Sequence, residues 1–313
     1  MTMRPRARWS RGLLALSTAL AVGLAGYCGT RPAGAGTSAA TAAAVRLAAA
    51  SGPAAAGLCS SKTHPRLAAG IARGIAGALR GRSSVVALTV DDPAEKITCA
   101  YHTWWRFPSA SVVKVIILGT LLRELQARHQ HIGPGQAALA RIMITQSDNH
   151  AATVLWNDVG PARLQGFLTA AGMNHTVLDP DGFWGMTLVN AHDEMVLLRL
   201  LVTPNKVLDR ASRAYALRLM ASVTPAQRWG VPAGAPSNVT VHVKNGWLPV
   251  PSLWVINSIG DFTQAAGAYS IAVLTRDNPS MAYGVDTVER VASPVNRGLA
   301  AYARWAARGS PRG

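Results

Sequence analysis

Residues 106–114 read Arg-Phe-Pro-Ser-Ala-Ser-Val-Val-Lys, and an apolar run follows them. This pattern predicts a helix that starts near Ser111, with Lys114 on the same face because residues three apart are neighbours on a helix. N–H groups of the first turn lack helical partners, so they can bind a developing oxyanion beside an amine that takes up a proton. We therefore expect Ser111 to be a nucleophile and Lys114 its base.

The scarcity of lysine supports this interpretation of Lys114. Only five of the 31 basic residues are lysines. Arginine cannot lose its proton in a protein, whereas burial lowers the pKa of lysine. A lysine at this position, in a chain that otherwise uses arginine, indicates a side chain that must lose its proton and act as a base, and not one that only supplies a positive charge.

Two further polar motifs lie at predicted element ends. Ser147-Asp148-Asn149 falls between two predicted helices, and Lys244-Asn245-Gly246 ends a predicted strand. An acid between two helices usually caps backbone N–H groups, so we expect Asp148 to be structural. Ser111 Oγ, Lys114 Nζ and Ser147 Oγ should lie within hydrogen-bond reach of one another.

The hydrophobic pattern outside these motifs predicts an α+β fold. Helices are expected over 67–79, over 111–221 in several pieces with breaks at Gly160 and in the loop 178–189, and from about 285 to 305 with a break at Pro294. Strands are expected at 84–90, 97–105, 239–244, 253–259 and 269–275. Neighbouring strands tend to pair, which gives a five-stranded antiparallel sheet flanked by the N- and C-terminal helices. An all-helical lobe, about 108–225, would be inserted in the α/β lobe.

The amino-terminal region predicts export. Residues 1–35 combine arginines, a short apolar run and small residues, which is typical of a signal peptide; an uncleaved anchor is the alternative. Residues 36–60 are rich in alanine and indicate a flexible linker, followed by one domain over 61–308. Cys28 follows a sequence that resembles a lipoprotein signal, so a lipidated Cys28 could tether the protein to the membrane. We expect an extracellular, wall-associated or tethered protein.

The net charge, the cysteines and the histidines limit which partners, cross-links and cofactors are expected. The net charge is +16, of which five arginines in residues 1–35 contribute +5. Basic clusters interleaved with aromatic residues are missing from the sequence, so we expect no nucleic acid as partner.

Cys59 and Cys99 form an even pair in an oxidising compartment and could form a disulfide; two buried thiols are the alternative. His150, His175 and His192 lack metal-ligand spacing, and we expect no metal, no cofactor and a monomer.

The three motifs together match Ser-x-x-Lys, Ser-Asp-Asn and Lys-Thr-Gly, apart from one residue of the third. Over about residues 64–306 the chain resembles class A β-lactamases and penicillin-binding-protein-like serine hydrolases, and among them a group of actinobacterial exported β-lactamase-like proteins. The resemblance implies that Ser111 becomes acylated, that Lys114 takes its proton, and that Ser147 passes a proton to the leaving nitrogen. It also implies substrate binding by Asn149 and a positive potential from Lys244.

The third motif and its surroundings are implied to bind substrate. The resemblance gives this role to Asn245, Gly246 and Trp247, with the backbone N–H groups of Ser111 and Trp247 as the oxyanion hole. Trp184 and Trp247 are adjacent to motif positions and should line the groove between the two lobes.

The sequence departs from the family pattern in three ways. The glutamate that activates the deacylating water in class A enzymes falls on Gly182, which leaves Asp181 as a weak substitute. Asn245 replaces a hydroxyl residue, and the first two motifs are only 147 − 111 = 36 residues apart. We therefore expect an exported serine hydrolase that acts through an acyl-serine on a β-lactam or cell-wall-type amide or ester, with weak deacylation. The alternative is a non-catalytic wall-binding or scaffold lipoprotein of the same fold.

Overall fold

The computed structural model describes residues 53–264 and 267–308 of the chain. The expected signal peptide, Cys28 and most of the expected linker lie outside these residues. Among the helices described, none has the length and apolar composition needed to cross a membrane.

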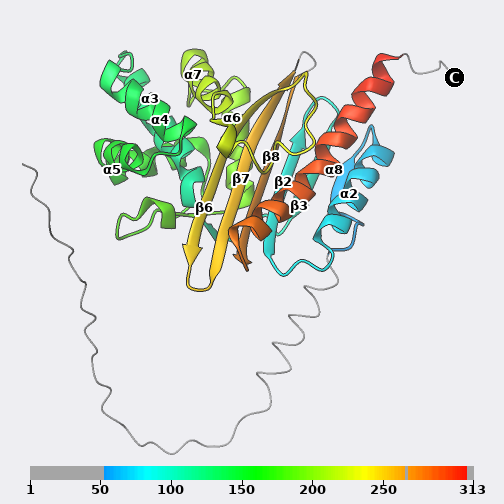
Figure 1. The fold of residues 1–313 in the computed structure, drawn as a ribbon. Helices are drawn as coiled ribbons and strands as arrows, with labels where there is room; N and C mark the ends of the chain where they lie inside the picture. Colours follow the sequence, from blue (N-terminus) through cyan, green and yellow to red (C-terminus); the bar gives the residue numbers. More distant parts are fainter. Residues whose placement is uncertain (1–52, 265–266, 309–313) are drawn as a thin grey trace, which may run out of the picture. The chain divides into compact units, whose positions relative to one another are not determined.

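A six-stranded antiparallel sheet is the centre of the fold (Figure 1). Its strands, in the order in which they lie, are β1 (Cys59–Ser61), β3 (Ile97–Tyr101), β2 (Val85–Asp92), β8 (Gly267–Asn278), β7 (Leu253–Gln264) and β6 (Thr240–Val250). The five expected strands are confirmed, and β1 adds a sixth at one edge. The expected linker boundary at residue 60 is wrong, because Cys59 already pairs with Cys99 in the sheet.

Two groups of helices cover the sheet. The helices are α2 (Pro65–Leu79), α3 (Val113–Ala127), α4 (Pro134–Thr145), α5 (Asn149–Ala171), α6 (Ala191–Val202), α7 (Arg210–Ala221) and α8 (Met281–Ala307). The terminal helices α2 and α8 pack together on one face, and the helices of the inserted lobe lie on the other side of the sheet (Figure 1). The α+β fold with an inserted helical lobe is thereby confirmed.

Two predicted helix breaks have different outcomes. Gly160 interrupts α5 with a non-helical backbone (φ 72°, ψ 161°), so the break expected there is confirmed. The break expected at Pro294 is wrong, since α8 is continuous through it. Pro294 fits closely against α2 because the residue opposite it is Gly74, where a Cβ would lie only 2.4 Å from Pro294 Cβ. The proline ring therefore packs directly against the backbone of α2.

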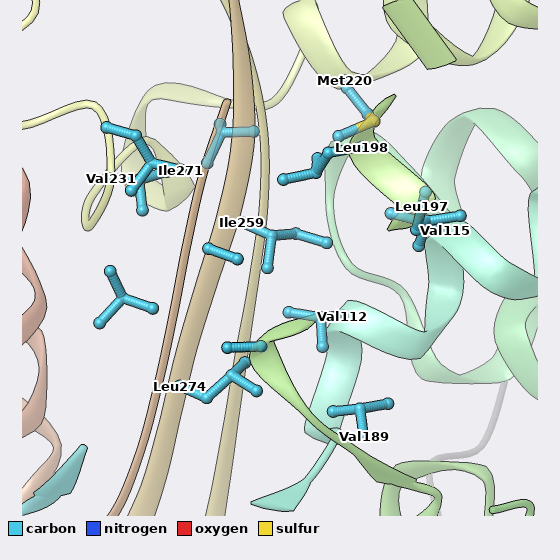
Figure 2. Close-up of a cluster of buried hydrophobic side chains, with 14 of the residues drawn as sticks. Val112, Val115, Val189, Leu197, Leu198, Met220, Val231, Ile259, Ile271 and Leu274 are labelled. Atoms are coloured by element: carbon cyan, nitrogen blue, oxygen red, sulfur yellow. The ribbon is translucent and has the colours of Figure 1, made fainter. Parts of the chain in front are cut away.

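Side chains buried between the sheet and the helical lobe hold the nucleophile segment in place. Val112 lies next to Ile259 and Leu274 of the sheet, and Val115 lies beside Leu197 of α6 (Figure 2); all five are at most 1% exposed. Burying each such side chain stabilises the fold by about 1.5–3 kcal/mol. Because Val112 directly follows Ser111, this core fixes the serine against the sheet.

Candidate active site

Ser111 lies in a short 3-10 turn, Ala110–Val112, that leads into α3. The preceding strand β4 (Phe107–Pro108) pairs with β5 (Leu188–Val189), which ends the irregular loop of the helical lobe. Ala110 has a φ of 47°, a left-handed conformation that costs a non-glycine residue about 1–3 kcal/mol. Strain of this kind is typical of a residue that aims a functional neighbour.

The sheet also holds this segment through Asn257, a residue the sequence analysis missed. Its amide donates to the carbonyl oxygens of Pro108 (2.9 Å) and Ser109 (3.1 Å), and its Oδ1 accepts from the Thr275 N–H at 3.1 Å. An amide residue close to the apolar residues Val255, Ile256 and Ile259 of the strand was the signal that could have identified it. Asn257 therefore positions the backbone just before Ser111.

Lys114 lies fully buried behind Ser111. Its Nζ donates to Ser147 O at 2.6 Å, to Ser147 Oγ at 3.2 Å and to Asn149 Oδ1 at 2.8 Å. The expected hydrogen bond with Ser111 Oγ is not found among the described residues. Hydrogen bonds between nucleophile and base often tighten only when substrate is bound. The first two motifs are nevertheless brought together as the spacing predicted.

Ser147 joins the second and third motifs. Lys244 Nζ donates to Ser147 Oγ at 2.9 Å and to Asn245 O at 2.7 Å. Ser147 itself has a φ of 58°, a left-handed conformation. Its hydroxyl accepts from both lysines, which leaves the hydroxyl proton free to be donated to a substrate. The expected role of Asp148 is confirmed, because its carboxylate caps α5 by accepting the Ala151 N–H at 2.7 Å.

Burial changes the proton affinity of both lysines. It lowers the pKa of Lys114 to about 7, while the nearby carboxylate of Asp148 opposes this shift. Burial also lowers the pKa of Lys244 well below its ordinary value, and the charge of Lys114 lowers it further. An amine with a pKa near 7 is neutral in a large fraction of molecules at neutral pH. Lys114 is thus able to accept the proton of a serine hydroxyl.

The edge strand β6 touches the nucleophile segment at Gly246. A Cβ at this position would lie 2.8 Å from Ser111 N and 2.9 Å from Ser109 O. Gly246 therefore allows the close approach of the strand, and its expected substrate contact stays a prediction. Trp247, the next residue, lines the pocket together with Ser111, so both residues expected to supply oxyanion-hole N–H groups meet there.

A pocket of about 470 Å³ opens above Ser111. We call the polar residues below it the site floor: Ser111, Lys114, Ser147 and Lys244, which are buried, and Asn149, which is exposed. We call the two sides the apolar walls: Phe183–Met186 and Trp247–Pro249. Trp184 and Trp247 line the groove, as predicted. Phe183, Met186, Leu248 and Pro249 were missed, although each is adjacent to, or within two residues of, a tryptophan expected there.

The Asn245 amide is used within the loop that precedes β6. Its Nδ2 donates to the carbonyl oxygens of Gln227 (2.7 Å) and Trp229 (2.9 Å), and the side chain is not part of the pocket lining. The loop before β6 thus requires two donors, which an amide supplies and a threonine hydroxyl does not. Asn245 therefore stabilises the loop, and its expected contact with substrate stays a prediction.

Asp181 is not placed to assist deacylation. It is exposed in the loop and does not line the pocket, and its neighbour Gly182 has a φ of 80°. The adjacent acid, Asp179, accepts the Phe183 N–H at 3.0 Å and so shapes the turn. The role expected for Asp181 finds no support in this geometry.

Cys59 and Cys99 form a disulfide, as one of the two alternatives predicted. They face each other across β1 and β3, so the bond fixes the sixth strand to the sheet. In the part of the chain that the structure describes, no three histidine, cysteine, aspartate or glutamate side chains are grouped as metal ligands would be.

Comparisons with known proteins identify the family and the fold. The sequence model of the β-lactamase enzyme family matches residues 136–299, so the chain belongs to this family of serine hydrolases. No curated sequence matches the chain.

Solved structures share the fold at low sequence identity. A β-lactamase from Sphaerobacter thermophilus DSM 20745 is 18% identical (TM-score 0.63), with 74% of this chain and 97% of that chain covered. A class A β-lactamase from Bacteroides cellulosilyticus DSM 14838 is 16% identical (TM-score 0.66), with 77% and 100% covered. A mutant of PBP-A, solved as an acyl-enzyme complex with penicillin G, is 17% identical (TM-score 0.63), with 75% and 97% covered.

Proposed function

We propose that this protein is exported and that its Ser111 is acylated by an amide or ester, either a β-lactam or a compound derived from the cell wall. The acyl group is then released slowly by hydrolysis. The observation that carries the proposal is the network of Lys114, Ser147 and Lys244 behind Ser111. Lys114 takes the hydroxyl proton while Ser111 Oγ bonds to the acyl carbon. Ser147 passes a proton to the leaving group as its bond to that carbon breaks.

Slow release follows from the charge-free lining of the pocket. Hydrolysis of an acyl-serine needs a base that activates water, and class A enzymes use a glutamate for it. Of the described residues that line this pocket, none is a carboxylate. Acylation and deacylation are thus expected to differ in rate, with the acyl-enzyme accumulating.

Intact-protein mass spectrometry tests this proposal. The protein is incubated with an alkyl fluorophosphonate, which labels activated serines, and separately with p-nitrophenyl hexanoate, an ester with a neutral acyl group. We expect an adduct that persists, that is lost in Ser111→Ala, and that is unchanged in Ser237→Ala, a control at an exposed serine. Labelling that survives in Ser111→Ala would refute the assignment of the nucleophile.

The same lack of a carboxylate favours a second function, a non-catalytic wall-binding protein of this fold. That function predicts no fluorophosphonate adduct at all, together with retention on purified cell wall by the Ser111→Ala protein. The first experiment therefore separates the two.

Export and tethering are supported by residues 1–35 and by the disulfide, a bond that persists in oxidising compartments. Fractionation of cells expressing the full chain or Cys28→Ser tests the tether. Release of the variant from the membrane fraction is expected for a lipidated Cys28, and an unchanged distribution contradicts it.

A further inference from the structure

The apolar walls contain no charged side chain among the described residues that line them. The polar residues that line the pocket below these walls, Ser111, Ser147 and Asn149, are neutral. Phe183 is 67% exposed and Met186 41% exposed. Large apolar side chains held in water beside a nucleophile are typical of a surface that an apolar ligand covers.

The cations of the site floor lie beneath this surface. Lys114 is 0% exposed and Lys244 is 1% exposed, and neither is part of the pocket lining. Their ammonium groups donate to Ser147, Asn149 and the Asn245 carbonyl. The face of Trp184 covers Lys114 Nζ, which lies 4.8 Å from the ring centroid. A substrate carboxylate in the pocket would therefore have no exposed ammonium group to pair with.

The third motif supplies no anion site either. Both donors of the Asn245 amide are used by loop carbonyl oxygens. The residue opposite it on β7 is the neutral Ser258, whose hydroxyl accepts the Val231 N–H at 3.0 Å. Arg228, in the neighbouring loop, donates to the carbonyl oxygen of Ala221 at the end of α7. An anionic group in the pocket would thus meet neutral donors but no cation in contact with it, and burying a charge without a paired cation is costly.

We propose that this active site selects neutral substrates, esters or amides whose acyl part carries an uncharged apolar chain or ring packed between Trp184 and Trp247. This inference rests on the proposed acyl-Ser111 chemistry and names the substrate class for it. The scissile bond lies at Ser111, the chain contacts the apolar walls, and the carbonyl oxygen lies at the N–H groups of Ser111 and Trp247.

A matched pair of substrates tests the selection. p-Nitrophenyl hexanoate and mono-p-nitrophenyl adipate have the same chain length and leaving group and differ only in a terminal carboxylate. Ser111 acylation is followed as the burst of p-nitrophenol, and the Ser111→Ala background is subtracted. We expect acylation by the hexanoate to be at least about tenfold faster, the discrimination that a single pocket contact can give.

A pair of variants tests whether the walls are the cause. Met186→Lys places a cation in the pocket and should reduce or reverse the preference for the hexanoate. Val177→Lys makes the same change at a residue of equal exposure, 41%, outside the pocket, and should leave the preference unchanged.

Two results would overturn the inference. One is acylation by the adipate at an equal or higher rate, and the other is acylation by neither ester in a protein whose Ser111 reacts with the fluorophosphonate. Failure of the fluorophosphonate reaction itself would instead refute the proposed acyl-enzyme, so the two failures are distinguishable.

Discussion

The site floor and the apolar walls differ in how firmly the fold holds them. Each polar group of Lys114, Ser147 and Lys244 has hydrogen-bond partners in the interior. In the walls, the Trp184 Nε1–H donates to Thr153 Oγ1 at 3.2 Å, while Phe183 and Met186 extend into water. The floor thus fixes one reaction, acyl transfer to Ser111. The walls determine which acyl group reaches the serine, and they can change without disturbing that chemistry.

Removing the base should have the largest effect. Lys114→Met keeps the side-chain length and removes the amine, so we expect the acylation rate to fall by about 10²–10⁴. The burst of p-nitrophenol measures the rate, and Lys96→Met, at an exposed lysine, is the control. An unchanged rate in a folded Lys114→Met protein would mean that the floor does not activate Ser111.

The pH dependence of acylation should show the same base. Burial lowers the pKa of Lys114 to about 7, and only the neutral amine accepts a proton. The rate should therefore rise about tenfold per pH unit below pH 7 and level off above it. A pH series of burst rates checks this. A rate that keeps rising beyond pH 9 would indicate a lysine with an ordinary pKa.

Gly246→Ala tests whether the contact between β6 and the nucleophile segment is as close as the structure gives it. The added Cβ would meet backbone atoms of Ser111 and Ser109, and overpacking of this kind costs about 1–3 kcal/mol. We expect lower stability in urea unfolding and slower acylation. Gly133→Ala is the control, since its Cβ would meet nothing within 4 Å. Equal stability of both variants would contradict the close approach.

Asp181→Asn should have the smallest effect, because this carboxylate lies outside the pocket. We expect the lifetime of the acyl-enzyme to change by less than about twofold, as for an ordinary surface substitution. Time-resolved intact mass measures the decay. A lifetime extended tenfold would show that the loop moves Asp181 to the ester, so that a residue outside the apolar walls contributes to turnover.

The sequence predicted the floor better than the walls, for physical reasons. Ser111 and Lys114 are near in sequence, and helical periodicity alone places them together. The direction of the Asn245 side chain depends on carbonyl groups 16 and 18 residues away, which no local pattern reveals. The exposure of Asp181 depends on how its loop turns, with Gly182 in a left-handed conformation.

The fold shows the same contrast between local and long-range determinants. Periodicity identified every long strand and most helices. The three-residue strand β1 was missed, because such a short segment has no pattern of its own and is defined by pairing with β3. Pro294 was misjudged because the glycine that accommodates it, Gly74, lies on another helix.

The two hydrogen bonds that converge on Ser147 Oγ come from residues 33 and 97 positions away. One donor belongs to the helical lobe and the other to the sheet. Any partial opening that separates the lobes breaks this junction before it exposes much of the core. Covalent labelling of Ser111 therefore reports cooperative assembly of the whole domain, and amide hydrogen exchange in α3 and β6 should slow together when the nucleophile is occupied.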